Sequence, residues 1–212
     1  MTGLGAFLWE RRGEIAALAG QHVLLVAAAT AIAVAVGVPL GVALTRRPRL
    51  ARPILGAANV IQTIPSLALF GFLIPVPFLG GIGARTAIVA LVLYGLLPIL
   101  RNTHAGIRSV DPAIVEAADG LGMTPGQRLR LVELPLAMPV VVAGVRVAVV
   151  VGVGLATIAA AIGAGGLGVL IYRGVATVDH RLILAGAVPA ALLAILFDVA
   201  LGFAEKRLSS RR

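Results

Sequence analysis

Few side chains in this sequence are placed to do chemistry. The chain contains no cysteine, which excludes disulfides, thiolate metal ligands and cysteine nucleophiles. Its three histidines, His22, His104 and His180, are scattered along the chain and form no ligand pattern. We therefore expect neither a metal site nor a catalytic centre, and the functional residues must serve binding or movement.

One glycine pattern could suggest a nucleotide site. Gly163, Gly165 and Gly168 match G-x-G-x-x-G, which binds dinucleotides only between a strand and a helix. Here the pattern follows a long apolar run without a β-rich flank, so we expect a flexible external turn or close helix packing. The phosphate-binding pattern G-x-x-x-x-G-K-[ST] is missing from the sequence, so any ATP hydrolysis must belong to a partner. No cofactor is expected.

The composition is that of a membrane protein. Of the 212 residues, 59% are hydrophobic and 13% are charged, whereas a soluble domain has about 25% charged residues. The net charge of +9 would suggest nucleic-acid binding in a soluble protein. Here the basic residues lie mainly between apolar runs, as topology signals do, so no nucleic-acid partner is expected. The predicted fold is an all-α, polytopic helix bundle in lipid.

Five apolar runs are predicted to span the membrane, at about residues 22–44, 54–75, 86–101, 136–161 and 182–203. A polar cytosolic loop, 102–135, separates the third span from the fourth. Residues 1–20 are predicted to form a short interfacial helix with Trp9 at headgroup level. The glycine-rich segment 163–178 is left open as an additional re-entrant or interfacial helix.

The basic residues predict the orientation of these spans. Twelve fall on the side of the loop after the first span: Arg46, Arg47, Arg49, Arg52, Arg101, Arg108, Arg128, Arg130, Lys206, Arg207, Arg211 and Arg212. Five fall on the other side: Arg11, Arg12, Arg85, Arg173 and Arg181. The positive-inside rule then predicts an external N-terminus and a cytosolic C-terminus in a prokaryotic cell membrane.

Polar side chains inside the spans are candidates for function. The second span holds four of them at helical spacing beside a predicted kink at Pro65: Asn59, Gln62, Thr63 and Ser66. They could line a translocation pathway, or they could form hydrogen bonds between helices. Both interpretations stay open.

Two opposite charges also lie inside spans. Arg146 is about 16 Å into the fourth span, and Asp198 lies about 12 Å into the fifth from the same side. We hypothesise that they form a structural ion pair, which would lower the cost of burying both charges. Asp198 is the only carboxylate within a predicted span, which disfavours a proton relay.

The polar loop is predicted to contain two short helices. Asp111 and Pro112 are typical of a helix start, and Gly122 of a helix end. Thr124, followed three residues later by Gln127, predicts a capping box. Pro135 is expected to mark the entry to the next span. The loop could be an amphipathic interfacial segment or a docking element for a cytosolic protein.

The spacing within this loop resembles a known motif. Glu116-Ala117-Ala118, three residues, Gly122, nine residues, Val132, one residue and Leu134-Pro135 resemble the EAA loop of permease subunits of binding-protein-dependent ABC importers. The family usually has isoleucine where Val132 stands. The resemblance implies that Glu116, Ala117, Ala118 and Gly122 form the contact core for a cytosolic ATPase subunit.

Four other stretches resemble the glycine betaine/carnitine/choline, or osmoprotectant, permeases: residues 61–69 (IQTIPSLAL), 96–103 (LLPILRNT), 143–146 (AGVR) and 162–168 (IGAGGLG). The resemblance covers about residues 20–205. It implies three partners: ATPase subunits, a second permease chain, either identical or homologous, and an extracytoplasmic solute-binding protein. It also implies alternating access without catalytic residues in this chain.

The sequence is also compatible with three alternatives. The solute could be an amino acid such as methionine or another small polar molecule. The chain could be a proton- or sodium-coupled secondary carrier, although inverted repeats and paired intramembrane carboxylates are missing from the sequence. It could also be a membrane scaffold that binds a partner but transports nothing.

Overall fold

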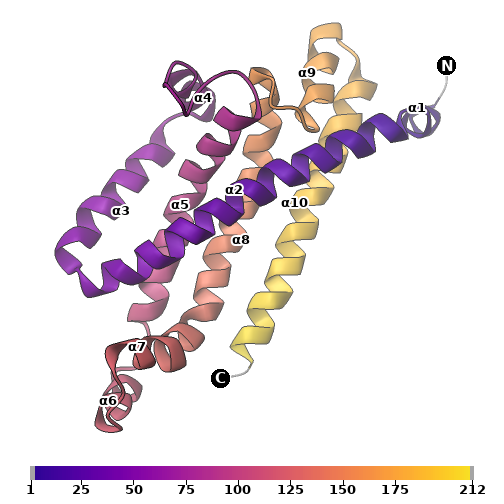
Figure 1. Ribbon diagram of the computed structural model, residues 1–212. Helices are drawn as coiled ribbons and strands as arrows, with labels where there is room; N and C mark the ends of the chain where they lie inside the picture. Colours follow the sequence, from indigo (N-terminus) through magenta and orange to yellow (C-terminus); the bar gives the residue numbers. More distant parts are fainter. Residues whose placement is uncertain (1–2, 211–212) are drawn as a thin grey trace.

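The computed structural model describes residues 3–210, and this range contains helices and no strand (Figure 1). The elements are α1 (Leu4–Glu10), α2 (Arg12–Arg46), α3 (Pro48–Thr63), α4 (Ser66–Leu73), α5 (Ala84–Arg108), α6 (Pro112–Gly120), α7 (Pro125–Arg128), the π-helix η1 (Leu129–Glu133), α8 (Leu134–Ala159), the 3₁₀-helix η2 (Ala160–Ile162), α9 (Gly168–Thr177) and α10 (His180–Ser209). The predicted all-α membrane bundle is confirmed. Arg211 and Arg212, counted above among the inside charges, lie outside the described residues.

Four helical segments of the described chain are long and apolar enough to cross a membrane: α2, α5, the continuous segment Pro125–Ile162, and α10. A fifth span results if α3 and α4 are taken together, although they are bent by 103°. The kink predicted at Pro65 is therefore a complete break. Ile64 adopts an extended conformation there (φ −70°, ψ 128°), as expected for a residue that precedes proline.

Helix α2 is much longer than the predicted first span. Its 35 residues correspond to about 52 Å, compared with about 30 Å for the hydrocarbon core of a bilayer. Figure 1 shows α2 running diagonally across the other long helices. The predicted N-terminal interfacial helix is reduced to α1. The guanidinium of Arg12, the first residue of α2, lies 4.5 Å from the centre of the exposed Trp9 ring in α1.

The core lies where α2, α5 and α8 pack together, and small residues allow their close approach. A Cβ atom on Gly41 would lie 2.7 Å from Cβ of Thr103 in α5. A Cβ atom on Gly144 would lie 2.7 Å from the carbonyl oxygen of Pro98. These glycines therefore set the spacing between α5 and its two neighbours.

The predicted polar loop, 102–135, is helical at both ends. Helix α5 continues to Arg108, past residue 102. On the other side, α7, η1 and α8 form one continuous helical segment. Pro135 lies at the start of α8, directly after the π turn, and does not interrupt the segment. A proline lacks the N–H of an α-turn and its ring opposes the preceding turn, so a wider π turn suits this position.

The glycine-rich segment 163–178, for which an additional re-entrant or interfacial helix was a possibility, contains the ten-residue helix α9. This helix packs against α10. A helix of this length, about 15 Å, is too short to span a membrane. Gly163, Gly165 and Gly166 precede it with left-handed φ angles of 77°, 83° and 78°, so they form a turn. Gly168, in contrast, permits close packing, because a Cβ there would lie 2.0 Å from the Thr157 carbonyl oxygen.

Candidate functional site

Helix α6 presents a short surface at the end of the bundle where α10 also ends (Figure 1). Its first turn is capped by Asp111, whose side chain accepts a hydrogen bond from the Ala113 N–H at 2.9 Å. Pro112 occupies the first helical position, where its missing N–H costs nothing. The start predicted from Asp111 and Pro112 matches this geometry.

The end of α6 requires glycine. The N–H of Gly122 donates to the Asp119 carbonyl at 2.9 Å, and the N–H of Met123 donates to the Ala118 carbonyl at 3.2 Å. This pair of bonds is the Schellman motif, which needs a left-handed residue after the helix. Gly122 has φ 76°, and a Cβ built on it would meet no atom within 4 Å. Glycine is thus needed for its backbone conformation and not for space.

The four residues predicted as the contact core differ in exposure. Glu116 and Ala117 are exposed on α6, and Gly122 is exposed after it. Ala118 is only 4% exposed, so it faces its own chain. Ala118 can support the helix from beneath but cannot contact a partner directly in this conformation.

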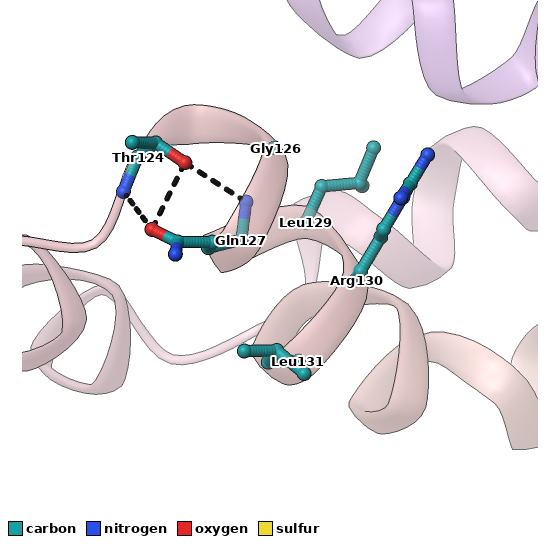
Figure 2. A pocket seen from close by; sticks show the side chains of 6 residues that line it. All are labelled: Thr124, Gly126, Gln127, Leu129, Arg130 and Leu131. Carbon is teal, nitrogen blue, oxygen red and sulfur yellow. Dashed lines mark hydrogen bonds between the residues drawn. The ribbon is translucent and has the colours of Figure 1, made fainter.

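The second half of the loop is fixed by the predicted capping box (Figure 2). The Thr124 N–H donates to Gln127 Oε1 at 2.8 Å, and the Gln127 N–H donates to Thr124 Oγ1 at 3.4 Å. A surface pocket of about 560 Å³ lies beside this turn, lined by Thr124, Gly126, Gln127, Leu129, Arg130 and Leu131. The loop therefore offers a shaped surface and not a disordered connection.

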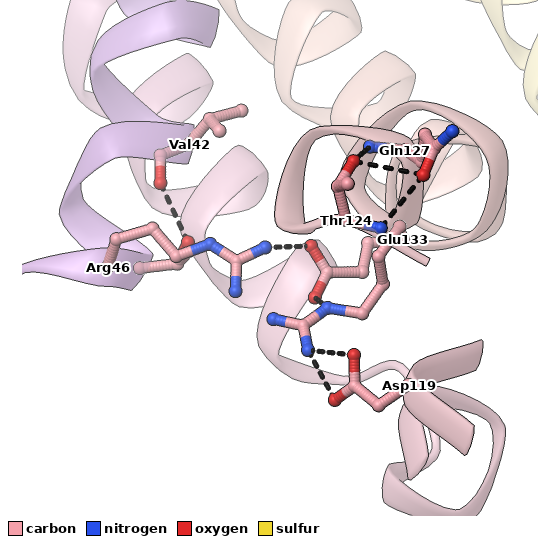
Figure 3. Close-up of polar contacts among 8 residues, drawn as sticks. Val42, Arg46, Asp119, Thr124, Gln127 and Glu133 are labelled. Atoms are coloured by element: carbon pink, nitrogen blue, oxygen red, sulfur yellow. Dashed lines mark hydrogen bonds and ion pairs between the residues drawn. The ribbon is translucent and has the colours of Figure 1, made fainter. Parts of the chain in front are cut away.

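A network of four charged residues, Asp119, Arg128, Glu133 and Arg46, joins this loop to the bundle (Figure 3). Arg128 donates from Nη1 to Asp119 Oδ1 at 2.6 Å, and its Nε lies 3.3 Å from Glu133 Oε1. The other carboxylate oxygen of Glu133 accepts from Arg46 at the end of α2. The sequence does not predict this charged network, because Arg46 and Glu133 are 87 positions apart and no local pattern connects them.

Among the four polar residues of the second span, Gln62 has a clear structural partner. Pro98 cannot donate to the carbonyl four residues earlier, which is that of Tyr94. Gln62 Nε2 supplies the missing donor at 2.7 Å. In return, the Tyr94 hydroxyl donates to the carbonyl of Ile64 at the helix break. These bonds hold the broken span to α5, so Gln62 fits the helix–helix interpretation.

The other three residues are arranged differently. Asn59 and Thr63 are exposed on α3, and the Thr63 hydroxyl donates to the Val60 carbonyl at 2.7 Å. Ser66 begins α4, beyond the break, so it does not share the helical face of Asn59 and Thr63. The structure thus does not unite the four residues in one site.

We predict that Gln62→Leu lowers the free energy of unfolding by about 1–3 kcal/mol, because the Tyr94 carbonyl then lacks a donor. Thermal unfolding of the detergent-solubilised protein measures this. The matched control is Asn59→Leu, on the same helix but exposed and without a hydrogen bond among the described side chains. Equal stability of the two variants would contradict the structural role of Gln62.

The intramembrane charges form a bidentate pair. Arg146 donates from Nε to Asp198 Oδ1 at 2.6 Å and from Nη2 to Asp198 Oδ2 at 2.8 Å. Its Nη1 also reaches Glu205 Oε2 at 3.3 Å. Glu205 lies beyond the predicted fifth span, which ends at residue 203, but α10 continues to Ser209 and places Glu205 two turns after Asp198. Gly202, between them, gives the guanidinium room: a Cβ there would lie 3.1 Å from Nη1.

A metal site is not evident in the described part of the chain: between residues 3 and 210, no three His, Asp or Glu side chains lie together as ligands. The polar groups found here are ion pairs and hydrogen bonds between helices. They stabilise an arrangement of helices and leave an exposed, capped helix at one end.

Comparison with known proteins relates this arrangement to a family. A family model described as "Binding-protein-dependent transport system inner membrane component" matches residues 33–211. The osmoprotectant import permease protein OsmW of Salmonella typhimurium is 50% identical over 194 residues, 91% of this chain and 90% of the relative. The glycine betaine/carnitine/choline transport system permease protein OpuCB of Bacillus subtilis is 42% identical over 211 residues, 100% of this chain and 96% of the relative.

A chain of the MetNI methionine ABC transporter, solved in an inward-facing conformation, has the same fold. It superposes with a TM-score of 0.83 at 24% identity, covering 98% of this chain and 99% of that chain.

Proposed function

Because the chain belongs to the family of binding-protein-dependent transport system inner membrane components, we propose that it is the membrane-spanning permease of an ABC importer for an osmoprotectant. The observation that supports this role most directly is α6. This helix is exposed, capped at both ends and joined to the bundle by the charged network. Such a helix suits the docking of a cytosolic ATPase subunit, with Glu116, Ala117 and Gly122 at its surface.

The proposed solute is glycine betaine, choline or carnitine. Its support is the identity of 42–50% to permeases that are named for these solutes or for osmoprotectants. An amino acid is the second candidate, but the methionine transporter shares only the fold at 24% identity. Quaternary ammonium groups are usually bound in aromatic cages, and this chain has nine aromatic residues spread along it. Selectivity is therefore assigned mainly to an extracytoplasmic binding protein.

The proposed mechanism is alternating access between two permease chains. One chain encloses little space, so the pathway forms against a second copy or a homologous chain. Asn59 and Thr63, exposed on α3, are proposed to line it. ATP binding brings the ATPase subunits together, moves α6, and favours the outward-open arrangement. This requires ATP to bind that arrangement more tightly than the other.

The proposed topology places the N-terminus outside and the C-terminus in the cytosol. Figure 1 shows the turn between α2 and α3, the α6–α7 loop and the end of α10 at the same end of the bundle. This end carries most of the basic residues, as expected for the cytosolic side. Helices α1, α4 and α9 lie at the opposite, external end.

The docking assignment predicts different effects for two neighbouring glycines. Gly122→Ala forces a left-handed conformation on alanine, at about 1–2 kcal/mol, so ATPase affinity should fall about five- to thirtyfold. Gly120→Ala is the matched control: it is helical and equally open to a Cβ atom, so affinity should be unchanged or better. Binding of purified ATPase subunit to the solubilised chain measures both. Equal affinities would contradict docking at α6.

The variants Gly122→Ala and Gly120→Ala also test transport, in proteoliposomes that contain the chain, its ATPase and its binding protein. Labelled glycine betaine should accumulate only with ATP, and the Gly122→Ala variant should accumulate less than the control. Unlabelled choline, carnitine and methionine then compete in turn to identify the solute class. Uptake that a protonophore abolishes at constant ATP would indicate an ion-coupled carrier, and ATPase binding without any uptake would indicate a scaffold.

A further inference from the structure

Glu133 is the one acidic side chain that is buried in the described part of the chain, at 5% exposure. A carboxylate removed from water is costly unless positive groups and hydrogen bonds surround it. Here two guanidinium groups hold it, one on each oxygen: Arg128 beside Oε1 and Arg46 on Oε2 (Figure 3). The burial and the double pairing show a built connection and not a solvated surface charge.

The π turn makes this connection geometrically feasible. In an α-helix, residues five positions apart point in directions that differ by about 140° around the axis. Arg128 and Glu133 are five positions apart, and the intervening residues form η1, whose hydrogen bonds join residues at that spacing. The two side chains therefore lie on one face, and Arg128 can bind Glu133 and Asp119 together.

The connection joins elements that otherwise contact each other little. The contacts of α6 with the rest of the chain are concentrated on α7 and η1. Helix α2, in contrast, packs along α5 and α8 and ends at Arg46. Asp119, Arg128, Glu133 and Arg46 therefore form a continuous ionic route from α6 to the cytosolic end of α2.

We propose that Glu133 is a positioning residue that makes α2 follow α6 during the transport cycle, through Arg128 on one side and Arg46 on the other. This inference rests on the proposed function, because it assumes that an ATPase subunit moves α6. Loss of the link should leave docking intact and weaken the conversion of ATP hydrolysis into solute movement.

The test uses the full complex in proteoliposomes and measures ATPase binding, ATP hydrolysis and solute uptake separately. Arg46→Met removes one partner of Glu133 at a helix end whose side chain is 40% exposed, so the variant should fold. ATPase binding should stay within about twofold of wild type, whereas uptake per ATP hydrolysed should fall about tenfold. Arg46→Lys, which keeps the charge, should restore most of the uptake.

Two further variants sharpen the measurement. Arg47→Met is the matched control, since the neighbouring arginine forms no ion pair with a described residue, and it should transport normally. Glu133→Gln should resemble Arg46→Met, and the double variant should be no worse than Glu133→Gln alone, because both changes break one link. Size-exclusion chromatography checks that each variant is folded.

A distance measurement separates transmission from a merely structural role. The chain has no cysteine, so spin labels can be placed at Ala43→Cys in α2 and Ile114→Cys in α6, both exposed positions. With Arg46 and Glu133 intact, the distance between the labels should stay constant between nucleotide-free and ATP-bound complexes. With Arg46→Met, the distance should change between these states.

Three distinguishable outcomes would overturn either the role of Glu133 or the proposed function. Wild-type uptake per ATP in both Arg46→Met and Glu133→Gln would disprove the link. Loss of ATPase binding in these variants would disprove it too, because the residues would then serve docking. Failure of the unaltered chain to bind any ATPase would instead overturn the proposed function itself.

Discussion

Replacement of Gly168 by alanine is expected to prevent the chain from reaching its folded state. The added Cβ would lie 2.0 Å from the Thr157 carbonyl oxygen and 2.8 Å from Cβ of Ala160. Backbone atoms cannot rotate away as a side chain can, so α9 would have to separate from the end of α8. We expect a loss of at least about 3 kcal/mol, a large part of the stability of a typical domain.

The matched control is Gly154→Ala, which adds the same group to α8 where no atom lies within 4 Å. Membrane expression and monodisperse extraction of the two variants provide the measurement. Gly154→Ala should behave as wild type, whereas Gly168→Ala should yield little or no folded protein. Equal yields would mean that α9 is not fixed against α8. A loss confined to Gly168→Ala would explain the last glycine of the pattern by close packing, without a nucleotide.

Loss of Arg146 is the second change with a large expected effect. Arg146→Met would leave Asp198 and Glu205 without their common partner inside a membrane-spanning helix. Two neighbouring carboxylates then repel each other in a medium that solvates them poorly. We expect the yield of folded protein and its thermal midpoint to fall, with yield changing several-fold.

A charge exchange tests whether the pairing itself is responsible. Arg146→Asp combined with Asp198→Arg should be more stable than either single change, although recovery will be partial because Glu205 then faces Asp at position 146. Adding Glu205→Gln should improve the recovery. Arg85→Met is the control, an exposed arginine without an ion pair to a described residue. A double variant no better than the singles would refute the pairing.

Local signals in the sequence predicted the caps of the loop well. A capping side chain contacts backbone groups only two or three residues away, so Asp111 and Thr124 show their role through spacing alone. The apolar runs likewise predicted that most spans exist, because a membrane requires about 20 apolar residues in a row. Both signals are contained in short stretches of chain.

Features that depend on distant residues could not be predicted in this way. Arg46 meets Glu133 across 87 positions, and Gln62 meets Tyr94 across 32. The effect of a proline on its helix could not be predicted either. Pro65 follows a complete helix break, whereas Pro135 lies within a continuous helical segment, just after a π turn. The tertiary surroundings decide between these outcomes, and the sequence around each proline does not contain them.

The length of α2 has a mechanical consequence. One end, at Arg46, pairs with Glu133, and near the other end Glu14 binds Arg173 at 2.7 Å and Gln21 accepts from the Gly166 N–H at 3.2 Å. A rigid rod of about 52 Å that pivots at its centre by 10° moves each end by about 4.5 Å, in opposite directions. Helix α2 can therefore act as a lever: a small push at the Arg46 end becomes a displacement of the glycine turn and α9 at the opposite end.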